Sequence, residues 1–177
     1  MIKLNNRFFV LVAVCPFLLS FTACCKKPDL EKERLTLLEL HKEQEVAHLN
    51  KDANLFVDQF ADKIVSVKGG KISTTSKDST LLRFQNYFDK VEIREWTDIN
   101  PPRIDFSTDA SMAYVIVDKL VLLTYKNAVN NLIEENTHFA WVSIFKKSKR
   151  EGWNFKNVLL NYCTGLNWWC CRLICLG

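Results

Sequence analysis

The order of hydrophobic patterns along the chain predicts an α+β fold. Apolar residues recur at helical spacing in three segments between residues 30 and 90, whereas strand-like patterns dominate from residue 91 to residue 163. Polar turns rich in Gly, Pro, Asn and Asp separate the later segments. Helices that come first, followed by a run of strands, are typical of an antiparallel sheet packed on its helices. The chain after position 23 has roughly 150 residues, enough for one domain with its own core.

The three predicted helices cover residues 30–50, 52–64 and 77–90. Asp29 is a candidate N-cap of the first helix, and Ser76 or Ser79 is a candidate N-cap of the third. In the second helix, Phe60 and Ile64 continue the helical spacing of apolar residues.

Strands are predicted where the spacing of apolar residues changes from helical to alternating. Residues 65–73 form a predicted hairpin, because Gly69-Gly70 supplies the positive φ angles that a tight turn needs. The sequence Asn100-Pro101-Pro102 ends one strand, and residues 108–111 form a polar turn between two others. The later predicted strands cover residues 91–98, 103–107, 112–125, 138–146 and 153–163.

The predicted strand at residues 112–125 is apolar on both faces, which indicates that both faces are covered. Helices are expected on one face, and a second copy of the chain is the candidate for the other. Asp118 and Lys119 interrupt this strand. One interpretation places these charges at the rim of the sheet or pairs them with a neighbouring strand. The other makes Asp118 a buried acid with a raised pKa, suited to proton transfer near neutral pH. The first interpretation is favoured.

The first 23 residues have the pattern of a secretory signal peptide. A short basic start precedes residues 8–23, which carry no charge and are too short for a comfortable membrane span of about 20 apolar residues. The run ends in Phe21-Thr22-Ala23-Cys24, which resembles the bacterial lipoprotein signal, whose cysteine is acylated and becomes the new N-terminus. We therefore expect Cys24 to be lipidated and residues 24–29 to be a tether. An ordinary cleaved signal followed by a disulfide cysteine is the alternative.

Charge and cysteine usage exclude several function classes. Removal of residues 1–23 takes away two cations and lowers the formal net charge from +4 to +2. Basic and acidic residues are interspersed, so we expect no nucleic-acid partner. Three of the seven cysteines lie in the first 25 residues and four lie between residues 163 and 175, so no disulfide framework spans the domain. The tail at residues 164–177 is rich in Cys and Trp and is predicted to be foreign to the fold. Its cysteine spacing matches no zinc site, and a redox or metal role is the minor alternative.

Three motifs occur in an order that carries a family resemblance. Residues 51–62 are KDANLFVDQFAD, a Gly69-Gly70-Lys71 turn follows, and the sequences HFAW at residues 138–141 and GWNF at residues 152–155 close the series. Over residues 30–163 this order resembles the nuclear-transport-factor-two-like superfamily, also called SnoaL-like or ketosteroid-isomerase-like. Residues 94–119 resemble a group of Bacteroidetes-type lipoproteins in that superfamily. The resemblance implies a strongly curved antiparallel sheet packed on three N-terminal helices, a cone-shaped pocket, and dimers as a common assembly.

The candidate ligand-pocket residues are the aromatics Trp96, Tyr114 and Trp141 together with Asp118. In a curved sheet some strand aromatics must line the concave side, where an apolar pocket has a few polar groups. Core packing is expected for at least half of the strand aromatics, Trp153 in particular.

Two sets of residues are candidates for catalysis. Asp118 is one, and His48 with Asp52, spaced like neighbours on a helix, is the other. The resemblance implies the second set, because some dehydratases of the superfamily use a histidine beside an acid. A capping or surface role is more common for such a histidine and is favoured over catalysis. No metal site or cofactor is expected in the domain.

The favoured function is that of a membrane-anchored lipoprotein of the bacterial cell envelope. Its domain is expected to bind a small apolar or amphipathic ligand, or a protein partner, without turning it over. The alternative is a SnoaL-like isomerase, dehydratase or hydrolase that uses a pocket acid. Binding is favoured because acid–base catalysis needs two groups whose pKa values are pushed apart, and the sequence places only one acid in the pocket.

Overall fold

The computed structural model describes residues 28–68, 70–148, 152–160 and 162–164. The predicted signal peptide, Cys24 and all but the first residue of the Cys/Trp-rich tail lie outside these residues. The helices are α2 (Leu30–Leu49), α3 (Ala53–Asp58) and α4 (Lys77–Phe88). In the described part of the chain, none of the helices combines the length and the apolar character that a membrane crossing requires.

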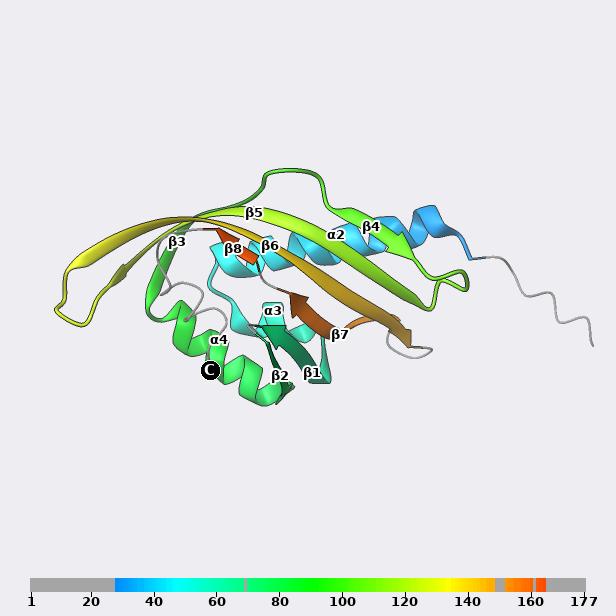
Figure 1. Ribbon diagram of the computed structural model, residues 1–177, viewed down its shortest axis with the longest axis horizontal. Helices are drawn as coiled ribbons and strands as arrows, with labels where there is room; N and C mark the ends of the chain where they lie inside the picture. The colour runs from blue at the N-terminus through cyan, green and yellow to red at the C-terminus, as the bar shows by residue number, and fades with distance from the viewer. Residues whose placement is uncertain (1–27, 69, 149–151, 161, 165–177) are drawn as a thin grey trace, which may run out of the picture.

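The strands form one curved sheet. They are β1 (Phe60–Lys68), β2 (Lys71–Ser76), β3 (Val91–Asp98), β4 (Arg103–Phe106), β5 (Met112–Lys126), β6 (Leu132–Ser148), β7 (Gly152–Leu160) and β8 (Tyr162–Thr164). The order is β2-β1-β7-β6-β5-β3, with β4 paired to β5 and β8 paired to β6. The pairing is antiparallel except between β1 and β7, which run parallel. Figure 1 shows β5 and β6 as a long curved pair that arches over the helices.

Side-chain caps begin each of the three helices. Asp29 accepts a hydrogen bond from the Lys32 amide at 3.2 Å, which confirms the predicted cap of α2. Of the two candidates for α4, Ser76 is the cap, and its Oγ accepts from the Ser79 amide at 3.1 Å. Each cap satisfies one of the backbone donors that the first turn of a helix leaves free.

The helix predicted at residues 52–64 is wrong in its second half, which forms a strand. The helix α3 ends at Asp58, and β1 begins at Phe60. Ile64 and Val67 lie opposite Thr75 and Ile72 of β2 in an antiparallel ladder. β-Branched residues fit a paired strand well, so cross-strand pairing outweighs the helical spacing here.

The strand predicted at residues 138–146 is longer than expected. Strand β6 begins at Leu132 and pairs residue by residue with β5, from Leu132 opposite Lys126 to Lys146 opposite Met112. The polar residues 134–137 hide the start of this strand in the sequence, because they lack the apolar alternation that marks a strand.

The β5–β6 pair has an inner face towards the helices and an outer face. On the inner face of β5 the buried residues are Ala113, Val115, Val117, Lys119, Val121 and Leu123. Most of them share one core with Leu37 of α2, Phe56 of α3 and Phe84 of α4. On the outer face Tyr114 and Ile116 are 39% and 38% exposed. The expected second subunit on that face stays a prediction.

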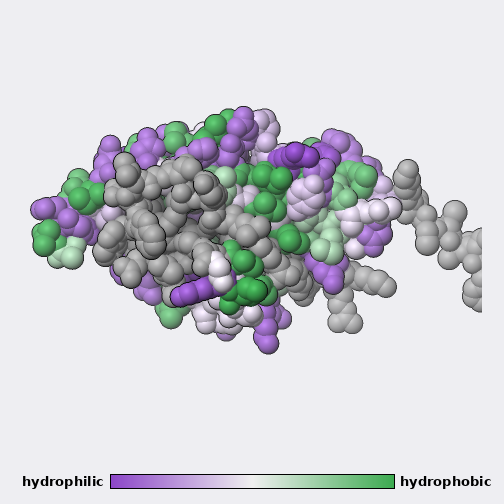
Figure 2. Space-filling model, viewed as in Figure 1, coloured by the Kyte–Doolittle hydropathy of each residue, from purple (hydrophilic) through white to green (hydrophobic). Residues whose placement is uncertain are grey.

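Exposed hydrophobic side chains are dispersed over the surface in the view of Figure 2. Some of them gather at the tip of the β5–β6 hairpin, where Val129 and Leu132 are 73% and 68% exposed. Single apolar residues on a surface are ordinary and by themselves mark no site.

Candidate functional site

Four ionisable side chains meet on the inner face of the sheet. We call His41 and Glu45 of α2, Asp98 of β3 and Lys119 of β5 the charged cluster. Lys119 is completely buried, and its Nζ lies 2.9 Å from Asp98 Oδ1 and 3.4 Å from Glu45 Oε2. His41 Nε2 lies 2.9 Å from Asp98 Oδ2. The antiparallel register sets Asp98 directly opposite Lys119, so the sheet itself brings the two charges together.

Burial and the neighbouring charges shift the pKa values of His41 and Glu45. Burial lowers the pKa of His41, and the positive charge of Lys119 lowers it further. The neutral imidazole therefore donates its Nε2–H to Asp98. Burial alone would raise the pKa of Glu45, but the hydrogen bond from Lys42 and the charge of Lys119 outweigh this and lower it. A buried ammonium flanked by two carboxylates is compensated, as buried charges must be.

An aromatic cluster lies beside the charged cluster. Its members are His48, Phe56, Phe84, Phe88, Trp96 and Trp141. The His48 ring stacks on Trp96 with 3.7 Å between centroids, and Trp96 lies 6.5 Å from Trp141. Burial lowers the pKa of His48 to about 3, so the ring is neutral and its Nδ1–H donates to the Gln44 carbonyl at 2.7 Å.

Two buried polar atoms on the inner face have no hydrogen-bond partner among the described residues. One is Oε2 of Glu135, a residue that is 4% exposed and whose Oε1 accepts from Thr137 at 3.0 Å. The other is Nε1 of Trp96, which is 5% exposed. A buried group without a partner is costly in free energy, so such atoms are candidate contacts for a ligand.

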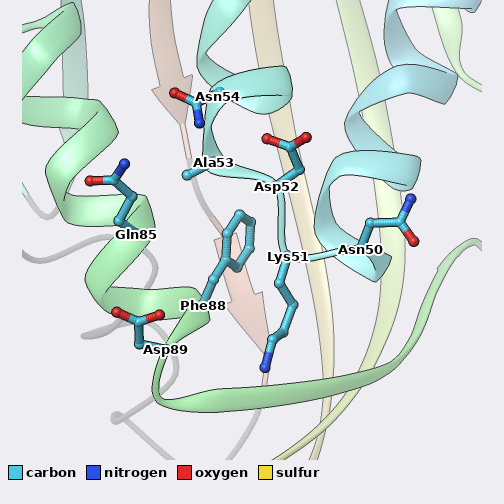
Figure 3. A pocket seen from close by; sticks show the side chains of 8 residues that line it. All are labelled: Asn50, Lys51, Asp52, Ala53, Asn54, Gln85, Phe88 and Asp89. Carbon is cyan, nitrogen blue, oxygen red and sulfur yellow. The ribbon is translucent and has the colours of Figure 1, made fainter.

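A pocket of about 320 Å³ opens at one rim of the domain. It is lined by Asn50, Lys51, Asp52, Ala53, Asn54, Gln85, Phe88 and Asp89, and we call it the rim pocket. Figure 3 shows the Phe88 ring between the α2–α3 turn and the polar side chains of α4. Phe88 is almost completely buried and packs edge-on against His48, 5.5 Å between ring centroids. The pocket thus has a polar rim and an aromatic floor that belongs to the aromatic cluster.

The structure divides the four predicted pocket residues between the two faces of the sheet. Trp96 and Trp141 lie on the inner face, whereas Tyr114 and Asp118 alternate with buried residues of β5 and lie on the outer face. The prediction of one pocket bounded by all four residues is therefore wrong, because successive side chains of a strand point to opposite sides. Trp153 is buried, as expected, and its Nε1 donates to Glu33 at 2.7 Å.

Asp118 accepts hydrogen bonds from the segment that follows β3. Its Oδ1 accepts from the Asn100 amide at 3.1 Å, and its Oδ2 accepts from Asn100 Nδ2 at 2.9 Å. Its Oδ2 also lies 3.9 Å from Nε2 of His138, which is 44% exposed. These contacts give Asp118 a positioning role on the outer face.

The other catalytic candidates, His48 and Asp52, have separate partners. His48 bonds to the Gln44 carbonyl, while Asp52 caps α3 by accepting from the Leu55 amide at 2.9 Å. Within residues 28–164, gaps excepted, no group of three or more His, Cys, Asp or Glu side chains is placed to hold a metal ion.

Sequence reasoning missed His41, Glu45, Asp98 and Glu135 as members of the site. Glu135 carries a usable signal, because it is in phase with Thr137, Phe139 and Trp141 along a strand of period two. Extension of the predicted strand towards Leu132 would have placed it on the inner face. Asp98 joins Lys119 through the β3–β5 register, and His41 and Glu45 join them only through the packing of α2 on the sheet.

Comparison with known proteins identifies the fold. No family model matches the sequence, and no curated protein matches it. An NTF2-like protein from Cytophaga hutchinsonii is 16% identical and has a TM-score of 0.55, over 75% of this chain and 98% of that one. An NTF2-like superfamily protein from Salmonella enterica is 12% identical, with a TM-score of 0.57 over 77% of this chain and 92% of that one. A proposed dehydratase of the NTF2-like family from Streptomyces avermitilis is 12% identical, with a TM-score of 0.57 over 79% and 99%.

At sequence identities this low, the similarity supports a shared fold and carries no conclusion about activity. The element order agrees with the neighbours over most of their lengths, with helices first and a strongly curved, largely antiparallel sheet after them. The chain therefore has the NTF2-like α+β fold, that of the nuclear-transport-factor-two-like superfamily.

Proposed function

We propose that this domain is a binding module for a small amphipathic molecule, which it holds in the rim pocket. The observation that carries the proposal is the composition of that pocket, a polar rim above the buried Phe88 ring. Six of the eight lining residues are polar or charged and only Ala53 and Phe88 are apolar, so the lining suits a small amphipathic ligand in which polar groups predominate. The volume of about 320 Å³ is at the lower end of the usual range for ligand sites, about 300–1,000 Å³.

The mutual ion pairs and hydrogen bond within the charged cluster favour binding without turnover. Lys119 is held between Asp98 and Glu45, and Asp98 also accepts from His41. Groups that compensate one another in this way are typical of a structural ion-pair network, whereas acid–base catalysis needs an acid and a base directed at a substrate. An isomerase or dehydratase activity that Asp98→Asn abolishes, with the fold intact, would favour the enzyme alternative.

Filling the rim pocket tests the proposal. The exposed Gln85 of α4 lines the pocket, so in Gln85→Trp the indole is expected to occupy space that a ligand needs. We expect the affinity for benzyl alcohol, used as a small amphipathic probe, to fall by at least about tenfold, or about 1.4 kcal/mol. Isothermal titration calorimetry on the full chain in phosphatidylcholine nanodiscs measures this, with empty nanodiscs as the background.

The matched control is Asn86→Trp, which adds the same indole at the next exposed position of α4, outside the lining of the pocket. It should bind benzyl alcohol like the unchanged chain. Equal losses in the two variants, or no loss in Gln85→Trp, would contradict the rim pocket as the site.

We further propose that the domain works in the bacterial cell envelope, tethered to a membrane through a lipid on Cys24. The support is the lipoprotein-like signal that ends at Cys24 and the start of α2 at Leu30, which leaves a six-residue tether, 24–29. Several acyl chains on one residue make such an anchor stable.

Cys24→Ser is expected to abolish acyl labelling and to leave the unprocessed precursor, because serine offers no thiol for the lipid. Metabolic labelling with radioactive palmitate and the mass of the chain measure the two effects. Cys25→Ser, one residue further on, should label normally. A mature N-terminus at any residue other than Cys24 would overturn the anchor.

A further inference from the structure

The helix α2 carries apolar side chains on the side that faces away from its buried residues. Leu35, Val46 and Leu49 are 54%, 38% and 42% exposed, and Leu38 is half-buried beside them. An α-helix repeats every 3.6 residues, so these four residues fall on one side of α2, away from the side that buries Leu37. We call the four residues the α2 stripe.

The α2 stripe differs from a single exposed apolar residue. Leu82 of α4, for example, is 60% exposed, but its neighbours three and four positions away on that helix are polar. The α2 stripe continues from Leu35 to Leu49, over most of the length of α2. A continuous exposed apolar surface is unfavourable in water and marks an interaction surface.

The positions of the α2 stripe are symmetric about Lys42. Leu38 and Val46 lie four residues on either side of Lys42, and Leu35 and Leu49 lie seven residues on either side. An antiparallel helix reverses the order of residues. A copy of α2 that crosses at Lys42 therefore brings its Leu49 to Leu35 and its Val46 to Leu38. The stripe is thus complementary to itself, as the interface of a two-fold symmetric dimer must be.

The charges on this side of α2 have the same symmetry. Lys42 is exposed, and Glu39 and Glu45 lie three residues before and after it. The Nζ atom of Lys42 donates to Glu45 Oε1 at 2.5 Å. Where two antiparallel copies of α2 cross, two ammonium groups therefore meet four carboxylates. These carboxylates compensate the repulsion between the two lysines, so the charges are complementary as well.

We propose that the α2 stripe is an interaction surface for a second copy of this chain, with the two α2 helices antiparallel and crossing at Lys42. This surface is separate from the outer face of the β5–β6 pair, where the apolar pattern of β5 predicts a second subunit. Packed helices have axes about 8–10 Å apart. The two Lys42 side chains are then close together, whereas lysines elsewhere on the domain, such as Lys90, are far from their copies.

Chemical cross-linking of the unchanged chain tests the crossing point. With the full chain in phosphatidylcholine vesicles, the short amine-reactive linker disuccinimidyl glutarate should join Lys42 to Lys42. Mass spectrometry identifies the linked peptide, and a link between two copies of one residue must join two chains. Lys90, which is exposed and outside the stripe, is the matched control and should give no link to its own copy. Absence of the Lys42–Lys42 link, or equal linking at Lys90, would overturn the inference.

Charges placed at two positions of the stripe test the register. Leu35→Lys puts a cation against Leu49 of the copy, so the dissociation constant of the dimer should rise at least about tenfold. Leu35→Lys combined with Leu49→Glu should restore the dimer in part, because the register sets each cation against the acid of the other copy. Light scattering coupled to size-exclusion chromatography of the full chain in dodecyl maltoside measures the protein mass over a range of concentrations.

Leu82→Lys is the control for these variants, since it makes the same change at an exposed leucine of α4, and it should stay dimeric. A monomeric unchanged chain, or a combined variant no more dimeric than Leu35→Lys, would overturn the inference. A dimer that Ile116→Glu dissociates and Leu35→Lys does not would place the second copy on the outer face of the sheet, and would also overturn it.

Discussion

Lys119→Met is expected to lower the free energy of unfolding by about 3 kcal/mol, the lower end of the range for breaking a buried ion pair. The change keeps an unbranched side chain of similar length and removes the ammonium that Asp98 and Glu45 share. The two carboxylates then have no common counter-charge. Their side chains are 23% and 19% exposed, so water compensates them in part, and this is why we expect the lower end. Urea denaturation followed by tryptophan fluorescence measures the effect.

Lys126→Met is the control for this prediction. Lys126 is on the same strand but exposed, and the usual effect of such a surface change is within about 0.5 kcal/mol. Lys119→Met combined with Asp98→Asn should recover part of the loss, because one of the two uncompensated charges is then gone. A Lys119→Met chain as stable as the parent would contradict the prediction that Lys119 compensates the two carboxylates.

Acidification from pH 7 to pH 5 is expected to lower the free energy of unfolding by about 2 kcal/mol through His48 alone. Burial lowers the pKa of His48 in the folded chain to about 3 from the ordinary value of 6.5. Below pH 6.5 the unfolded chain therefore binds a proton that the folded chain does not bind. Stability falls as the pH falls through this window, by at most about 1.4 kcal/mol per pH unit for one group. His41 has its pKa shifted in the same direction and adds to the loss.

His48→Phe isolates the contribution of His48, because it keeps an aromatic ring against Trp96 and removes the titrating group. The stability of this variant should fall less steeply between pH 7 and pH 5, and urea denaturation at several pH values measures the difference. His138→Phe changes an exposed imidazole on the outer face and should keep the parent's pH dependence. Parallel curves for His48→Phe and the parent would contradict the assignment.

Most helices and strands of the fold could be predicted from the sequence. The strand at residues 91–98 agrees with β3, and the helix predicted at residues 77–90 agrees with α4 to within two residues. Both are long, strongly patterned segments with a clear cap or stop. The prediction was wrong where two patterns compete, at residues 59–64, because pairing of β1 with β2 and β7 is a contact between distant segments.

Only part of the candidate site could be predicted from the sequence. Trp96 and Trp141 were predicted together and lie 6.5 Å apart, whereas Tyr114 and Asp118 lie on the other face. Strand β5 is apolar at both odd and even positions, so its pattern shows the alternation but not which set faces the helices. The helices decide this, and they bury Lys119 instead of Asp118.

The sequence by itself determined the fold class, the order of the elements, the turns and the helix caps, because these depend on residues close together in the chain. Only the tertiary structure decided which face of the long strands became the interior, and which charges met there. His41, Asp98 and Lys119 are separated by many residues, and the energy of a buried charge depends on its neighbours in space. The same reason makes Glu135 a candidate contact and its neighbour Glu134 an ordinary surface residue.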